Sequence, residues 1–578
     1  EVLKGSSQVK YGPSTTGGVL NYRSTQIPGQ TRSYAKVLQG RFNETQTHIH
    51  TVGKIGNFSY LLEAASRKTD GFRRFDKLEN VQIDRDETGH RIIDPMIKLA
   101  YEPKSENFQR FELKFGHFDM KANETYLGLT DEDFEKNPYR RYQASRFDQI
   151  NSEHDRSYLR HVFITQGETE ITTTAYYNRF HRNWYKLDKV NGNTPLSDDS
   201  DYQTLVGKAS GTLDVKANNR NYESRGLDQN WIINLKDHKL NIGVRFHRDR
   251  IKRFQKVDTY NQSTNGSISS IDRGEPGSSD NRSQKAQALA GFLQDEWKFS
   301  PKWTVTPGIR YEHIRFKFLD HKASDGELKE TLTVVNPGIG LRYQYNPKST
   351  YFAGLYKGSA LPSPKAATKE NNPLEDEKSY NFETGVRYHN SLFSLESTLF
   401  YTRLEDLLAL ESNATNSNID ASIGKAQTYG VELKTHKNFK WNENLDQSLY
   451  LTATFSKSEI GGNYDSGSYL SGEKGNALPY SPEWQFTVGS NVSWKNFGLD
   501  LWGTFVDKMY RTGENLSSEK IESHFIFNLT SHYQLGKSSK ILFHAKNIFD
   551  EEHRVSRSPY GSRAGQPLVL LAGLEFSL

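Results

Sequence analysis

The segment 245–256 carries the densest group of basic side chains in the chain. It contains Arg245, His247, Arg248, Arg250, Lys252, Arg253 and Lys256. Guanidinium groups stay charged at any relevant pH and bind carboxylates through two parallel hydrogen bonds. We therefore expect an anion-binding site, and we select Arg245, His247, Arg250 and Arg253 as its candidate ligand-binding residues. Arg140 and Arg141, in a long polar segment, are the next candidates. The alternative is that these side chains belong to a solvated loop base.

Two histidines and two acidic runs could in principle hold metal ions. His48 and His50 lie two residues apart, which places both imidazoles on one face of a strand. Neutral imidazoles bind metals, but no third ligand is evident, so a polar pair without a metal is favoured. The acidic runs 131–133 and 375–377 could bind calcium, although solvation explains them more simply. The sequence thus predicts no metal site and no cofactor.

Composition excludes several classes of protein. The absence of cysteine excludes disulfides and thiolate metal sites. The 75 Lys and Arg residues nearly balance the 70 Asp and Glu residues, which argues against a nucleic-acid-binding protein. No phosphate-binding loop and no Ser/His/Asp constellation is evident, so we do not expect an enzyme. No apolar run is long enough for a transmembrane helix.

The elements that must position the candidate residues alternate with a period of two. Leu240, Ile242, Val244 and Phe246 alternate with Asn241, Gly243, Arg245 and His247. The same pattern recurs in the segments 484–494, 524–535 and 568–578. One apolar and one polar face per strand suits either a sandwich or a transmembrane β-barrel.

The lengths of the connections decide between these two architectures. Ten tight polar turns are predicted at 53–57, 103–106, 166–168, 236–238, 299–302, 345–348, 389–391, 441–444, 494–497 and 535–537. Between them lie ten long polar stretches and a short hairpin near 41–45, which makes eleven loops. Short turns on one side and long loops on the other are typical of outer-membrane barrels. The sequence therefore predicts an all-β protein, a 22-stranded antiparallel transmembrane β-barrel, with Trp303, Tyr311, Trp484 and Trp494 in interfacial girdles.

The first thirty residues do not follow this pattern. The segments 1–5 (Glu-Val-Leu-Lys-Gly), 11–13 (Tyr-Gly-Pro) and 17–22 (Gly-Gly-Val-Leu-Asn-Tyr) resemble the end of the plug domain of TonB-dependent outer-membrane receptors. The segments 354–362, 377–385, 428–433 and 546–550 are similar to barrel motifs of that family, as is 573–578, although the family usually ends in Phe. The resemblance implies the C-terminal end of a plug at 1–30 and a receptor barrel at 31–578.

Within the family, the chain is most similar to ferric-citrate, or iron(III) dicitrate, receptors. The similarity lies in 123–130 (Asn-Glu-Thr-Tyr-Leu-Gly-Leu-Thr), 133–134, 137–142 (Asn-Pro-Tyr-Arg-Arg-Tyr) and 243–250. Haem receptors of the family carry a histidine between two motifs that correspond to 358–362 and 372–374, and none occurs there in this chain. The resemblance therefore implies ferric citrate as the ligand and argues against haem.

The resemblance also implies the mechanism and the partners. A receptor of this kind lies in the outer membrane of a Gram-negative bacterium, in contact with lipid and lipopolysaccharide. Arg245 and His247 are expected to face the lumen near the outer end of their strand, and the loops 360–379 and 406–421 to close over the ligand. TonB–ExbB–ExbD would drive import through the N-terminal region. Because the plug is mostly absent here, we expect no energised transport by the chain as written.

Several alternatives remain open on the sequence alone. The ligand could be another siderophore, haem or a nickel chelate. The chain could also be a passive porin-like barrel or an adhesin. The basic residues could hold lipopolysaccharide at the outer rim instead of a chelate.

Overall fold

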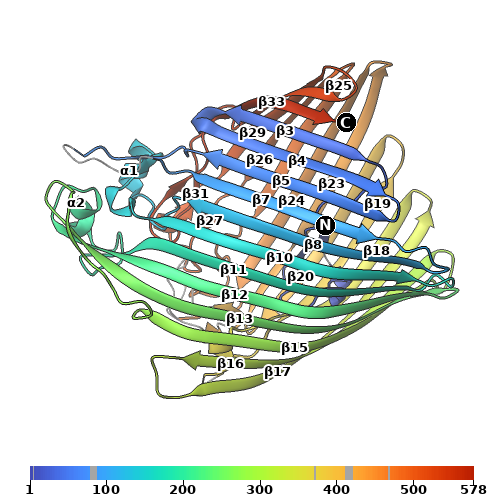
Figure 1. Cartoon of the computed structure of the whole chain (residues 1–578), viewed down its shortest axis with the longest axis horizontal. Helices are drawn as coiled ribbons and strands as arrows, with labels where there is room; N and C mark the ends of the chain where they lie inside the picture. The colour runs from blue at the N-terminus through green and yellow to red at the C-terminus, as the bar shows by residue number, and fades with distance from the viewer. Residues whose placement is uncertain (4, 79–86, 370–372, 410–420, 423, 466–468) are drawn as a thin grey trace.

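A closed antiparallel β-barrel makes up most of the molecule (Figure 1). The computed structural model describes residues 1–3, 5–78, 87–369, 373–409, 421–422, 424–465 and 469–578. Within these residues, 22 strands close the barrel, which confirms the predicted fold. They are β3 (Arg32–Gly40), β4 (Glu44–Ile55), β5 (Phe58–Thr69), β7 (His90–Tyr101), β8 (Phe108–Ala122), β10 (Gln149–Ile164), β11 (Glu170–Val190), β12 (Gly211–Asn234), β13 (His238–Gln262), β15 (Asp280–Trp297), β16 (Trp303–Asp320), β17 (Glu327–Asn346), β18 (Ser349–Ala360), β19 (Glu377–His389), β20 (Phe393–Glu405), β23 (Ala426–Asn442), β24 (Leu445–Ile460), β25 (Trp484–Trp494), β26 (Phe497–Val506), β29 (His524–Gln534), β30 (Ser539–Lys546) and β33 (Val569–Ser577).

The barrel closes where β3 pairs with β33. Ala35 lies opposite Phe576, and the backbones of Ser33 and Leu578 exchange two hydrogen bonds of 2.9 Å. Closure pairs every strand on both sides, which removes the exposed sheet edge that hydrocarbon would not tolerate.

The connections sort by length as the sequence predicts. Each of the ten predicted short turns joins two consecutive barrel strands, and the longer connections lie at the other end. In Figure 1 the long loops, with α1 and α2, gather at the left end of the molecule. This end is extracellular if the barrel follows the usual orientation of outer-membrane proteins. The parts of the predicted long loops at 79–86, 370–372, 410–420 and 466–468 lie outside the described residues.

The side chains alternate between the two faces of the wall. Val244 and Phe246 on β13 are 45% and 43% exposed on the outer face, whereas Arg245 between them faces the interior. Aromatic rings collect near the short turns: Trp303 and Tyr343 pack with centroids 4.4 Å apart, and Tyr343 stacks on Tyr351. Such a girdle suits the membrane interface. No helix among the described residues is long and apolar enough to cross a membrane.

The extracellular loops pack into a hydrophobic cluster of their own. Its buried members come from the loops 123–148, 191–210 and 547–568 and from the ends of β11 and β12: Tyr126, Leu127, Leu129, Phe134, Tyr142, Ala144, Leu187, Val190, Leu205, Val206, Leu213, Tyr560 and Ala564. The small elements of the loops are β6 (Arg74–Phe75), α1 (Asp131–Lys136), β9 (Arg140–Arg141), α2 (Tyr202–Leu205), β14 (Ile268–Asp272), α3 (Pro364–Ala367), β21 (Leu408–Ala409), β22 (Ala421–Ser422), β27 (Met509–Tyr510), β28 (Lys520–Ile521), β31 (Arg554–Ser556) and β32 (Arg563–Ala564).

The N-terminal segment lies against the inner wall instead of joining the barrel sheet. Strands β1 (Val2–Leu3) and β2 (Val19–Leu20) pair with each other, and a 3-10 helix at Gly5–Lys10 contacts β15 to β19. Arg310 of β16 donates hydrogen bonds to the carbonyls of Val9 and Lys10, at 3.4 and 3.3 Å. These contacts fix the segment to one side of the lumen.

Candidate ligand-binding site

Four arginines from neighbouring strands form a row on the inner wall. In the strand register, Arg182 of β11 lies opposite Arg220 of β12. Arg220 lies opposite Arg253 of β13, and Arg253 lies opposite Arg282 of β15. Cross-strand partners share a face of the sheet, and Lys252 and Phe254 on either side of Arg253 are exposed on the outer face. We call these four residues the inner arginine row.

The inner arginine row gathers four positive charges from neighbouring strands on one face of the wall. Asp280 forms ion pairs with Arg253 at 3.5 Å and with Arg282 at 3.3 Å, while Arg220 Nε donates to Asn218 Oδ1 at 2.8 Å. The Nε atom of Arg182 is buried and has no hydrogen-bond partner within the described chain. Like charges that face one another across a sheet are destabilising. A row of this kind is therefore well suited to bind an anion.

The row lies toward the extracellular end of the barrel. Arg253 is in the half of β13 that is farther from the short turn. Tyr126, an aromatic residue of the loop 123–148, lies close enough to Arg182 and Arg220 for their charges to act on its phenol. Burial raises the pKa of the Tyr126 phenol, and the positive charges of Arg182 and Arg220 oppose that rise. Tyr126 also packs edge-on against Trp184 of β11, with ring centroids 4.5 Å apart. The loop thus brings aromatic surface to the row.

Comparison with known proteins identifies the family. Residues 100–548 match the family described as TonB dependent receptor-like, beta-barrel. The chain belongs to this family. It is accordingly an outer-membrane β-barrel of a Gram-negative bacterium, and proteins of the family act as receptors and transporters, not as enzymes.

Individual relatives of this receptor barrel are distant. The pesticin receptor of Yersinia enterocolitica is 24% identical over 300 residues, which cover 48% of this chain and 41% of the relative. The ferric enterobactin receptor of Pseudomonas aeruginosa is 22% identical and matches 95% of this chain and 75% of its own length. The unliganded ferric citrate transporter FecA superposes with a TM-score of 0.78 at 20% identity, over 100% of this chain and 83% of that one. The receptor barrel thus spans well under half of the pesticin receptor, and the structural likeness shows the fold alone.

The structure separates Arg245 from Arg253. Both face the interior, but Arg245 is in the half of β13 nearer the short turn, so its predicted place near the outer end of the strand is wrong. Eight residues separate the two, which corresponds to about 26 Å along a strand at ~3.3 Å per residue. Arg245 Nε donates to Asp228 at 2.8 Å, beside an interior cavity of about 650 Å³ that Tyr11 and Arg23 also line. His247 lies near Arg245 and contacts Asp249 at 2.8 Å.

Arg250 does not face the lumen. Its even position on β13 places it with Phe246 on the outer face, where it is exposed and lies opposite Lys285 of β15. The prediction that it lines the ligand site is therefore corrected, because strand alternation excludes it. It belongs instead to a set of outward-facing cations just beyond the apolar face, which we call the outer basic band: Arg225, Arg248, Arg250, Lys252, Lys285, Arg315, Lys317 and Lys329.

Arg140 and Arg141 are engaged within the extracellular loops. Arg140 forms ion pairs with Asp76, at 2.7 Å, and with Asp133. Arg141 is buried, donates to Ser145 Oγ at 3.0 Å and lies over the ring of Phe75. Their guanidinium groups hold the loop 123–148 to the segment that contains β6. This arrangement gives both residues a role in shaping the loops.

Proposed function

We propose that this barrel belongs to a TonB-dependent importer of a ferric chelate that carries free carboxylates, with ferric citrate as the first candidate. The observation that carries the proposal is the inner arginine row. Four strands spaced by ~4.8 Å place the four guanidinium positions over roughly 14 Å. A chelate with several carboxylates can meet such a row through several bidentate contacts, each stronger than a neutral hydrogen bond.

The residues around the row support the same ligand class. Asp280 forms ion pairs with Arg253 and Arg282, and the buried Nε atom of Arg182 has no hydrogen-bond partner among the described residues. An anionic ligand would offer that nitrogen an acceptor, which a purely apolar or cationic ligand would not. Haem offers only its two propionate carboxylates, and a nickel chelate without free carboxylates offers none, so each would gain less from the row than ferric citrate.

We further infer that residues 1–30 form the end of a plug and that the ligand passes when TonB, with ExbB and ExbD, moves that plug. The hydrogen bonds from Arg310 to the Val9 and Lys10 carbonyls support a segment that is held by the wall and can be released. An interior cavity lined by Tyr11 and Arg245 lies beside that segment.

The outer basic band supports a second partner, the phosphate groups of lipopolysaccharide. Arg250, Lys285, Lys317 and Lys329 follow one another in register across four strands. Glu327 lies 3.0 Å from Lys317 and 3.8 Å from both Lys285 and Lys329. A single carboxylate is therefore the shared ion-pair partner of three lysines. Replacing Lys285, Lys317 and Lys329 with Gln should lower the lipopolysaccharide that copurifies with the barrel. Equal amounts in both proteins would contradict this assignment.

A titration of tryptophan fluorescence tests the main proposal. Trp184 packs close to the row through Tyr126, so a ligand bound there should change the emission of the purified full-length receptor. Ferric citrate, iron-free citrate, haemin and a nickel–histidine chelate would be compared at equal ionic strength. Saturable quenching by ferric citrate alone is expected. Quenching by haemin or the nickel chelate alone would reject citrate as the ligand, and no response to any of the four would reject chelate binding at the row.

A further inference from the structure

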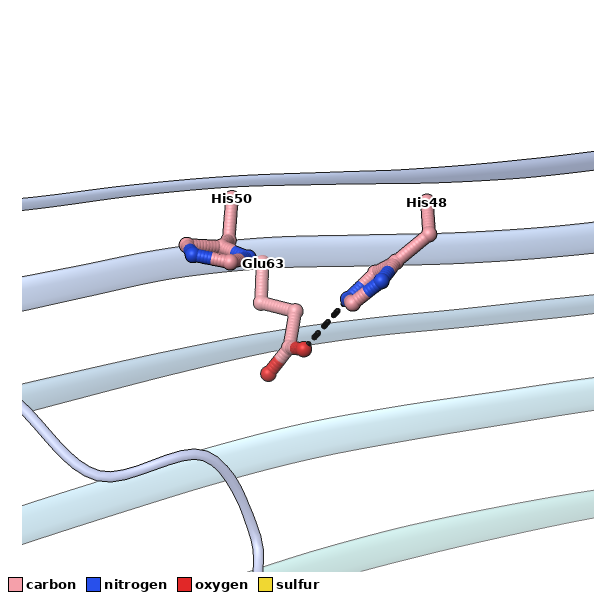
Figure 2. A group of neighbouring side chains, drawn as sticks. All are labelled: His48, His50 and Glu63. Carbon is pink, nitrogen blue, oxygen red and sulfur yellow. Dashed lines mark hydrogen bonds and ion pairs between the residues drawn. The ribbon is translucent and has the colours of Figure 1, made fainter. Parts of the chain in front are cut away.

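Two histidines and one glutamate meet on the inner wall at the N-terminal side of the barrel. His48 and His50 project from β4 and Glu63 from β5 (Figure 2). His50 lies directly opposite Glu63 in the strand register, and His48 is two residues farther along the same face. One ligand atom from each of the three side chains can be chosen so that all lie within 4.8 Å of one another. Strand pairing thus brings in Glu63 as the third ligand, which the sequence alone does not reveal.

One hydrogen bond accounts for only part of this cluster. His48 Nε2 is 2.7 Å from Glu63 Oε1, as the dashed line in Figure 2 marks. His50 has no such contact: its Nδ1 atom is buried and lacks a hydrogen-bond partner in the described chain. Buried polar atoms are nearly always satisfied, and an orphan of this kind points to a water or an ion. The carboxylate of Glu63, across the ladder from His50, provides the charge that a cation would need.

We propose that His48, His50 and Glu63 bind a divalent transition-metal ion of the zinc, cobalt or nickel class. Two imidazoles and one carboxylate are a ligand set that suits these metals, with water or another donor completing the shell. Because two adjacent strands of a closed sheet hold the three ligands, metal binding requires little further loss of their conformational freedom. The site is independent of the inner arginine row, which lies on β11 to β15.

Contacts around the three ligands would orient them for a metal. Tyr34 of β3 stacks on His50, with centroids 5.0 Å apart and planes 16° apart. The Thr25 hydroxyl donates to Glu63 Oε1 at 2.9 Å, and Lys98 Nζ donates to the Thr25 carbonyl at 2.6 Å. Such surrounding hydrogen bonds commonly set the orientation of metal ligands. Because Thr25 belongs to the N-terminal segment, the metal would also tie that segment to the wall.

Cobalt and zinc binding test the site. The full-length receptor, without a histidine tag and after treatment with EDTA, would be titrated with CoCl2 by visible absorption and with ZnCl2 by calorimetry. One ion per chain is expected for each metal, with intensified cobalt d–d bands. His50→Gln and Glu63→Gln should each weaken binding at least tenfold. His117→Gln is the matched control, because His117 pairs with Asp155 at 2.8 Å but belongs to no described three-ligand cluster.

Each outcome has a definite meaning. Saturable binding that both cluster variants weaken and His117→Gln retains supports the site. Absence of saturable binding, or equal affinity in all four proteins, overturns it. Heat-modifiable migration in gel electrophoresis would show that each variant barrel is folded, and His48→Asn provides a second test if one variant fails to assemble. Ferric citrate binding measured in parallel keeps failure of this site distinct from failure of the proposed import function.

Discussion

Arg220 and Arg253 lie directly opposite one another on neighbouring strands and face the same side of the sheet. Two guanidinium groups in a cross-strand pair repel each other. Arg182 and Arg282 extend the repulsion on either side. Such a concentration of like charge on one face is expected where an anion binds.

Removing one member of the pair should therefore stabilise the ligand-free barrel. Arg220→Gln is expected to raise the free energy of unfolding by roughly 0.2–1 kcal/mol, the usual size of a cross-strand charge effect. Denaturant unfolding in detergent measures the change. Lys252→Gln is the matched control, because Lys252 faces outward opposite Asn221 and should change little. A destabilised Arg220→Gln protein would contradict the charge argument.

The loop 123–148 should respond to acid through Asp133. Burial raises the pKa of this carboxyl, but hydrogen bonds from Tyr142 and Tyr202, at 2.5 and 2.9 Å, and the Arg140 charge leave its pKa below 3.8. The ionised form is thus the one that folding favours. Its contribution to stability is complete above pH 3.8 and is lost as the pH falls through the lowered pKa.

Hydrogen exchange of the loop checks this prediction. At pH 7, Asp133→Asn should weaken protection of 123–148 by about 1–3 kcal/mol, because a charged acceptor of two hydroxyl groups is lost. At a pH below the Asp133 pKa, the variant and the parent should exchange alike. Glu132→Gln serves as the control, because Glu132 is exposed and, among the described residues, pairs with Lys136 alone. A difference that persisted unchanged in acid would argue against the role of this carboxylate.

Arg310 should control how firmly the N-terminal segment is held. Its guanidinium is buried, pairs with Glu312 at 2.5 Å and donates to the carbonyls of Val9 and Lys10. Arg310→Met would leave Glu312 buried without its partner, a change that commonly costs about 3–5 kcal/mol. Ion conductance through the barrel in planar bilayers is expected to rise as the segment loosens. Arg315→Met, on the outer face of the same strand, should leave the conductance unchanged, and equal conductance in all three proteins would refute the anchor.

The fold could be predicted because strand alternation and turn chemistry are local properties. The ten tight turns and the exposed faces of β13, β25 and β33 follow from neighbouring residues alone. The same local rule also excludes Arg250 from the lumen, since it is an odd number of residues from Arg245. The predicted position of Arg245 is wrong because the number of residues from the short turn, and not the basic run itself, sets how far along the strand a side chain lies.

The inner arginine row could not be predicted without the pairing of strands. Arg182, Arg220 and Arg282 are isolated in the sequence, and only the register of β11, β12, β13 and β15 places them beside Arg253. Turn positions are the available signal only when they are exact to one residue: Leu235 pairs with His238 across the turn, which places Arg220 opposite Arg253, whereas a turn centred on 237 would place Phe254 there. In the same way, only the pairing of β4 with β5 places Glu63 beside His48 and His50.

The most direct test of the proposed function is ferric citrate affinity in two matched double variants. Arg220→Ala with Arg253→Ala removes half of the inner arginine row, whereas Arg248→Ala with Arg250→Ala removes the same charge from the outer face of the wall. Affinity should fall at least tenfold in the inner variant and stay within twofold in the outer one, because a lost charged hydrogen bond costs about 1.5–3 kcal/mol. Unchanged affinity in the inner variant, or an equal loss in both, would contradict the assignment of the row as the ligand site.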